Sequence, residues 1–139
     1  MSREGIELPS VKGLIELHAE VLAAHGGPPG LRDRGILEAA LAHPHQLLAY
    51  SEKYMSVSDL AAALCVSIVR GHAFVDGNKR MGLIALGVTL AMNGLDLDIA
   101  EREAARVILE LADNKMDEPT FREWVHRNTY EMVEPPPED

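Results

Sequence analysis

Two apolar stretches, LAAALCVSIVR at residues 60–70 and NKRMGLIALGVTLAMN at residues 78–93, decide the fold of this chain. Each is apolar on nearly every side when wound into a helix, and helices of that kind belong in the middle of a bundle. Ser56 or Ser58 is suited to cap the first helix, and Gly71 is suited to end it. The sequence therefore predicts two central helices joined by a short polar loop.

Shorter stretches on either side have the residue spacing and the punctuation of further helices. Pro44 separates two of them, because a proline inside a helix removes a hydrogen bond and disfavours the helical turn before it. The further helices expected are residues 10–26, 33–43, 46–54, 98–113 (capped by Asp98) and a last one opening at 117–119. A brief extended segment is compatible with residues 95–98, but no strong strand pattern is present. The predicted fold class is all-α, a compact single-domain helical bundle.

The length and composition fit one globular domain. The chain has 139 residues, which is long enough to bury a core. Its residues are 47% hydrophobic and 25% charged, which is an ordinary globular composition. We assign residues 1–133 to the helical domain and the segment 134–139, made of proline and acidic residues only, to a disordered tail. The formal net charge of −9 argues against direct binding to nucleic acid, because a phosphate-backbone binder needs a concentrated positive face.

Cysteine content and hydropathy indicate the cellular compartment. Cys65 is the single cysteine and cannot form an internal disulfide, which fits a reducing environment. The N-terminus lacks the apolar run of a signal peptide, and the longest apolar stretch, residues 81–92, is too short to span a bilayer. The sequence therefore predicts a cytoplasmic protein without membrane contact.

The loop between the two central helices carries the side chains best suited to chemistry. His72 can accept a proton near neutral pH, and Asp76 offers the carboxylate oxygens that Mg²⁺ prefers beside phosphates. Gly77 permits close approach of the backbone, and the free N–H groups of a helix start favour an anion. Further donors and two positive charges come from Asn78, Lys79 and Arg80. This set predicts phosphoryl transfer, which depends mainly on positioning and charge stabilisation.

Each of these residues also has a purely structural interpretation. His72 fits a hydrogen-bonded residue at a helix end, Asp76 a helix cap, and Gly77-Asn78 an ordinary turn. Lys79 and Arg80 fit a solvated helix start, although cations at an N-terminus oppose the helix dipole and so favour an anionic ligand. Because several roles converge in one loop, we favour the functional interpretation.

The segment His72-Ala73-Phe74-Val75-Asp76-Gly77-Asn78-Lys79-Arg80 resembles the signature of the Fic/Doc family, and is most similar to its Doc (death-on-curing) branch of toxins. The resemblance extends from residues 25–33 to Asn93-Gly94, and residues 10–128 fit the family's helical bundle. It implies that His72 is the general base on a target hydroxyl and that Asp76 holds Mg²⁺ against the phosphates of ATP. It also implies phosphate binding by Asn78 and Arg80, with Phe74 as buried anchor and Gly77 in the anion hole.

Two departures from the broader Fic pattern bear on the reaction. That pattern has Gly in place of Lys79 and a second Arg in place of Leu83, and such enzymes typically transfer AMP. The Doc branch carries the Lys and behaves as a protein kinase towards elongation factor Tu. The resemblance therefore favours phosphorylation, with AMP transfer as the alternative and a catalytically silent binding module as a third hypothesis.

Regulation and the remaining polar residues complete the expectations. The chain lacks the inhibitory run of many Fic proteins (Ser or Thr, three residues, Glu, then Gly or Asn), which implies restraint by a separate, Phd-like antitoxin. Arg70 is a further candidate for the site, although capping the helix C-terminus is its simpler role. His43 and His45 lack further ligands for a metal, and His18 and His25 are interpreted as ordinary.

Overall fold

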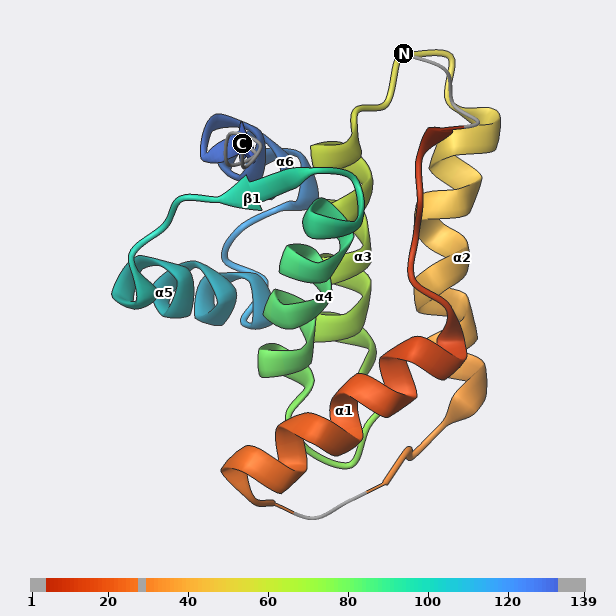
Figure 1. The fold of residues 1–139 in the computed structure, drawn as a ribbon, viewed down its shortest axis with the longest axis vertical. Helices are drawn as coiled ribbons and strands as arrows, with labels where there is room; N and C mark the ends of the chain where they lie inside the picture. Colours follow the sequence, from red (N-terminus) through yellow and green to blue (C-terminus); the bar gives the residue numbers. More distant parts are fainter. Residues whose placement is uncertain (1–4, 28–29, 133–139) are drawn as a thin grey trace, which may run out of the picture.

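The computed structural model describes residues 5–27 and 30–132, which form six helices and one small two-stranded sheet (Figure 1). The elements are α1 (Val11–His25), α2 (Arg34–Tyr50), α3 (Val57–Gly71), α4 (Asn78–Met92), β1 (Leu95–Leu97), α5 (Glu101–Ala112), α6 (Glu118–Arg127) and β2 (Thr129–Glu131). The predicted helical bundle is confirmed, whereas the tail predicted at 134–139 lies outside the described residues. Within the described ranges, no helix combines the length and apolar character that crossing a membrane requires.

The two central helices, α3 and α4, pack closely against each other (Figure 1). Gly82 makes this possible, because a Cβ atom there would lie 2.4 Å from Val69 Cγ2 and 3.2 Å from the carbonyl oxygen of Cys65. The close packing brings the end of α3 beside the start of α4. Residues 72–77 join the two helices at this end of the bundle.

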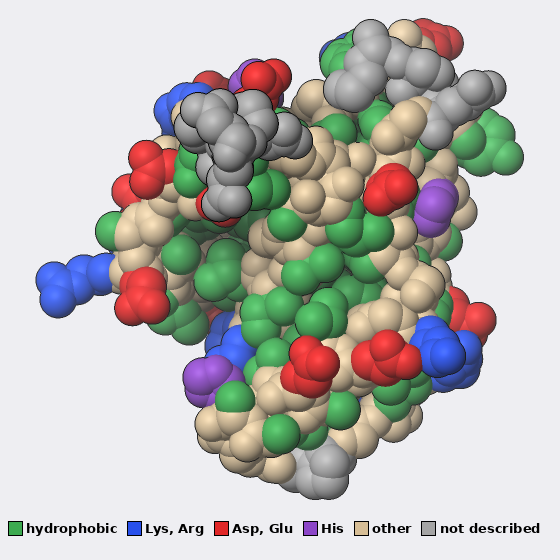
Figure 2. All heavy atoms as spheres, viewed as in Figure 1, with side chains coloured by type: hydrophobic (Ala, Val, Ile, Leu, Met, Phe, Trp, Pro, Cys, Tyr) green, Lys and Arg blue, Asp and Glu red, His purple; other side chains and the backbone are tan. Residues whose placement is uncertain are grey.

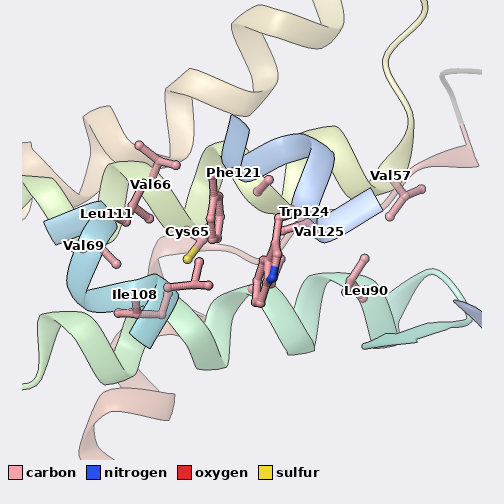
Figure 3. Close-up of a cluster of buried hydrophobic side chains, with 14 residues drawn as sticks. Val57, Cys65, Val66, Val69, Leu90, Ile108, Leu111, Phe121, Trp124 and Val125 are labelled. Carbon is pink, nitrogen blue, oxygen red and sulfur yellow. The ribbon is translucent and has the colours of Figure 1, made fainter. Parts of the chain in front are cut away.

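The hydrophobic core lies on both sides of α3. On one side, α1 and α2 contribute Leu14 and Leu37 against Ile68. On the other side, α5 and α6 close the core, with the rings of Phe121 and Trp124 stacked at a centroid distance of 5.6 Å (Figure 3). Most of α3 is therefore buried between its neighbours, which fixes the position of the loop that follows it.

The prediction that Pro44 separates two helices is wrong. α2 runs through Pro44 to Tyr50, and the proline is buried together with Leu37, Ala40 and Leu41. A proline inside a helix costs about 3 kcal/mol through its missing N–H and its steric clash. Packing of this apolar face against α3 offsets that cost, and such packing is a tertiary effect that local sequence does not reveal.

The C-terminal half differs from the prediction in two further places. α5 begins at Glu101 with Ala100 as its N-cap, because Asp98, the predicted cap, donates its backbone N–H to the carbonyl oxygen of Asn128 at 2.8 Å. This bond extends an antiparallel pairing of β1 with β2, in which Asp96 lies opposite Tyr130. The extended segment at 95–98 was anticipated, but its partner strand was not.

We predict that Gly82→Ala destabilises the protein by about 1–3 kcal/mol, because the new methyl group must displace the stiff side chain of Val69 or the α3 backbone. Gly87→Ala on the same helix is the matched control, since nothing lies within 4 Å of its Cβ position. It should stabilise by up to about 1 kcal/mol through helix propensity. Urea unfolding measures both, and equal effects at the two positions would contradict the close packing.

Candidate active site

A hollow of about 380 Å³ lies at the end of the bundle where α3 turns into α4. Its size falls within the range of roughly 300–1,000 Å³ typical of small-molecule sites. The lining residues are His72, Val75, Asp76, Gly77, Asn78, Lys79, Arg80 and Ala112. The structure thus brings together every residue of the predicted site except Arg70, and adds the end of α5.

His72 has a left-handed backbone, with φ 56° and ψ 46°, and forms the C-cap of α3. This conformation is unfavourable for a residue with a side chain, so the surrounding structure must stabilise it. The sequence had placed the helix terminator at Gly71, which is instead the last residue of α3. His72 is exposed, and its imidazole makes no hydrogen bond within the described ranges. The ring is therefore available to a ligand.

The segment 30–33, which leads into α2, runs antiparallel to residues 73–75 and supports the site from outside. The carbonyl oxygen of Ala73 accepts from the N–H groups of Arg32 and Asp33 at 2.8 and 3.0 Å, and Leu31 forms a β-bridge with Phe74. The Arg32 Nε also donates to the carbonyl oxygen of His72 at 2.8 Å. Sequence reasoning gave Arg32 no role, because the contact spans forty residues of the chain.

Asn78 shapes the loop with its side chain. Its Oδ1 accepts the Phe74 N–H at 3.0 Å, and its Nδ2 donates to the Phe74 carbonyl oxygen at 2.9 Å. Only 8% of Asn78 is exposed, so these bonds form away from competing water. An anion above the loop is therefore offered the backbone N–H of Asn78 at the helix start, while the side chain holds Phe74 in place.

The N-terminus of α4 carries an uncompensated positive field. Four other helices are capped by side-chain oxygens of Ser10, Asp33, Ser56 and Asp117. At α4 the N-cap is Gly77, with φ 79°, which offers no capping side chain, and the first turn holds Lys79 and Arg80 but no acid. The helical ladder begins with Met81 N–H to the Gly77 carbonyl oxygen. In the described part of the chain, the N–H groups of residues 78–80 have no hydrogen-bond partner, so they are free to bind an anion.

The charged side chains around this helix start are unpaired. Within the ranges 5–27 and 30–132, the side chains of Asp76, Lys79 and Arg80 form no hydrogen bond or ion pair, and all three are exposed. Gly27 passes beside the carboxylate, because a Cβ atom there would lie 3.0 Å from Asp76 Oδ2. Its φ of 116° also suits glycine alone. Because residue 27 has no side chain, the space beside the Asp76 carboxylate stays open.

Arg70 does not line the hollow. Its Nη2 donates to the Met116 carbonyl oxygen at 2.7 Å, and its Nε donates to the Leu111 carbonyl oxygen at 3.3 Å. The guanidinium thus ties the end of α3 to the end of α5 and to the segment that follows it. The structure gives Arg70 this structural role in place of the ligand contact considered from the sequence.

We predict that the left-handed backbone at His72 makes stability there depend on the backbone freedom of the substitute. His72→Gly should leave the free energy of unfolding unchanged or raise it by up to about 1 kcal/mol, since glycine adopts this conformation readily. His72→Val should lower it by about 1–3 kcal/mol. Both variants lack the imidazole, so urea unfolding compares the backbone alone. Equal stability of the two variants would refute the strain.

In this helical bundle, one hollow is thus lined by an imidazole, a carboxylate and the uncapped, cationic start of α4. The model of the Fic/DOC family matches residues 9–90. The chain is 38% identical over 100 residues to Toxin Doc of Mycolicibacterium smegmatis, which covers 72% of each chain. It is 34% identical over 88 residues to Protein kinase doc of Escherichia phage P1, which covers 63% of this chain and 69% of that one. This chain belongs to the Fic/DOC family, and the predicted resemblance to the Doc branch is confirmed.

Proposed function

We propose that this chain is a toxin that transfers a phosphate from ATP to a hydroxyl side chain of a target protein and thereby arrests growth. The observation that carries the proposal is the hollow itself, where an exposed imidazole faces the same space as an uncapped helix start. The names Toxin Doc and Protein kinase doc of two relatives support it. The net charge of −9 repels large polyanions such as nucleic acid. The local positive field of Lys79 and Arg80 therefore selects a small anion that can enter the hollow.

The residues fit Mg²⁺ bound together with a nucleotide. Mg²⁺ is usually held by one or two carboxylates plus substrate phosphates and water, whereas dedicated all-protein cages are less common for it. Asp76 supplies one exposed, unpaired carboxylate, and the described residues contain no cluster of three or more His, Cys, Asp or Glu. Asp76 would hold the ion, which when bound neutralises charge on the phosphates.

The proposed reaction uses His72 as the proton acceptor. The target hydroxyl loses its proton to the imidazole as its oxygen bonds to the γ-phosphorus, and the bond between that phosphorus and the β,γ-bridging oxygen breaks, releasing ADP. The α4 N–H groups, together with Lys79 and Arg80, stabilise the negative charge on the phosphate oxygens. The left-handed backbone of His72 sets the direction in which its side chain leaves the loop, which supports the proposed orientation of the imidazole towards the target hydroxyl.

Transfer of phosphate is favoured over transfer of AMP because of the positions of Lys79 and Leu83. Both line an apolar pocket of about 320 Å³ that adjoins the hollow and also includes Arg80. Position 83 lies one helical turn beyond Lys79, and as leucine it brings no positive charge to that pocket. The positive charges are thus concentrated at the start of α4. This distribution favours the placement of the triphosphate proposed above, in which the γ-phosphorus lies at the target hydroxyl. As the target we propose elongation factor Tu, in the cytoplasm.

We predict that ATP labelled at the γ-phosphorus transfers its label to purified elongation factor Tu, and that ATP labelled at the α-phosphorus does not. His72→Ala should lower the rate by about 10²–10⁴-fold through loss of the general base. Asp76→Asn keeps the side-chain shape and removes the charge, so it should raise the Mg²⁺ concentration needed for half-maximal rate. Electrophoresis with autoradiography measures all three.

Label from the α-phosphorus alone would replace the kinase proposal by AMP transfer. Growth assays separate both enzymes from a silent binding module. If wild type, His72→Ala and Asp76→Asn arrest growth equally, the effect is binding without catalysis. Arg122→Ala, in an ion pair with Glu118 on α6 and outside the hollow, controls for loss of protein through reduced stability.

We further propose a Phd-like antitoxin as partner, with an apolar segment docked between α4 and α5. The pocket beside the hollow continues into a second one of about 390 Å³, and Leu83 and Ala105 line both. Leu109 is 52% exposed at this surface, and together with Leu83 and Ala105 it forms an apolar patch of the kind that a partner covers. Because Lys79 and Arg80 line the same groove, a segment docked there would restrict the hollow.

We predict that Leu109→Glu weakens binding of the antitoxin by more than tenfold, since it places a charge against an apolar partner surface. Tyr50→Glu is the control, because Tyr50 is 83% exposed on α2 and does not line the groove. Isothermal titration with the purified cognate antitoxin measures both. Unchanged affinity of Leu109→Glu would move the partner to another surface.

A further inference from the structure

A buried histidine outside the signature segment contacts the loop of the proposed site. His18, on α1, is 4% exposed, and its ring stacks on Phe74 with centroids 4.0 Å apart and planes inclined by 17°. Its Nε2 lies 2.9 Å from the carbonyl oxygen of Asp76. A carbonyl oxygen only accepts, so Nε2 carries the proton and donates it. No sequence pattern connects His18 with a loop fifty-eight residues away, and only folding brings the two together.

The bonded carbonyl belongs to the peptide unit that also carries the Gly77 N–H. In a trans peptide the C=O and the N–H point in opposite directions, and the described residues contain no cis peptide. Because His18 holds the Asp76 oxygen towards α1, the Gly77 N–H points away from α1. Gly77 lines the hollow, so this N–H is presented on the side where an anion would bind.

This peptide unit is also able to turn over, because glycine follows it. Rotation of a peptide changes ψ of the residue before it and φ of the residue after it, and glycine at position 77 accepts either sign of φ. A turned peptide would direct the carbonyl oxygen of Asp76 to the hollow and repel an anion there. A buried donor on that oxygen opposes the rotation, since the turned state leaves the imidazole N–H unsatisfied.

We infer that His18 is a positioning residue, which locks the Asp76–Gly77 peptide so that its N–H, and not its carbonyl oxygen, meets the phosphate groups of the nucleotide. The inference rests on the proposed function for the identity of the anion. The stack on Phe74 sets the angle of the imidazole, and the side chain of Asn78 fixes Phe74 in turn. The bond to Asp76 and the stack are separable by substitution.

The test compares His18→Phe, which keeps an aromatic ring and removes the donor, with His18→Gln, which keeps a donor and removes the ring. We expect the Kd for Mg²⁺–ATP to rise about tenfold in His18→Phe, the effect of losing roughly 1.4 kcal/mol. His18→Gln should stay within about threefold of wild type. His45→Phe, at an exposed position on α2, is the control for the substitution itself.

A purely structural role would give a different pattern, in which affinity follows thermal stability in both variants. Nuclear magnetic resonance adds a readout independent of catalysis. The wild type should show a slowly exchanging His18 Nε2–H, and the Gly77 amide should shift in His18→Phe but return towards wild type in His18→Gln. Wild-type affinity together with an unmoved Gly77 amide in His18→Phe would overturn the inference.

Failure of the proposed function is distinguishable from failure of this inference. If wild type binds no ATP, the nucleotide proposal falls, and titration with inorganic phosphate then tests the helix start alone. Phosphate should shift the Gly77 amide in wild type and in His18→Gln, and at least tenfold more should be needed in His18→Phe. Equal phosphate titrations in wild type and His18→Phe would refute the positioning role whatever the substrate.

Discussion

The close packing of α3 against α4 at Gly82 is the constraint on which the site depends. It brings the last residue of one helix and the first of the next near enough for six residues, 72–77, to join them. A helix C-terminus with His72 and a helix N-terminus with Gly77 therefore line one hollow. Apolar packing on both sides of α3 holds this arrangement, so the core determines the geometry of the polar loop.

The side chains that support the loop and those exposed at the hollow are different residues. Arg32, His18 and Asn78 bond to backbone atoms of the loop, at His72, Asp76 and Phe74 respectively. The side chains of His72, Asp76, Lys79 and Arg80 are instead exposed and unpaired in the described part of the chain. Backbone groups fixed by neighbours need little reorganisation when a charged ligand arrives, which is the condition for electrostatic stabilisation of a transition state. An acidic molecule can thus keep a positive site, because the field of the α4 start acts over short range. Apolar side chains lie over α4, between α1 and β1, on the face shown in Figure 2.

Much of the fold follows from local signals. The limits of α4, the cap of α3 at Ser56 and the cap of α6 at Asp117 agree with sequence expectations, because capping and apolar periodicity act within a few residues. The continuity of α2 through Pro44 and the pairing of β1 with β2 do not follow from such signals. Burial against another element decided both, and it outweighed the local preference.

The sequence by itself determined which chemical groups meet, because nine consecutive residues carry the imidazole, the carboxylate, the glycine and the cations of the candidate site. It also determined the helical class and the family. The tertiary structure alone decided how those groups are held. In the folded chain His72 has a left-handed backbone, and the side chain of Asn78 bonds to Phe74. Arg70 bonds outside the hollow, and His18 lies within hydrogen-bond distance of the Asp76 carbonyl oxygen. The physical reason is that the spacing of residues along a chain specifies neighbours within a turn or two. Orientation of a peptide plane depends on hydrogen-bond partners that only folding brings close.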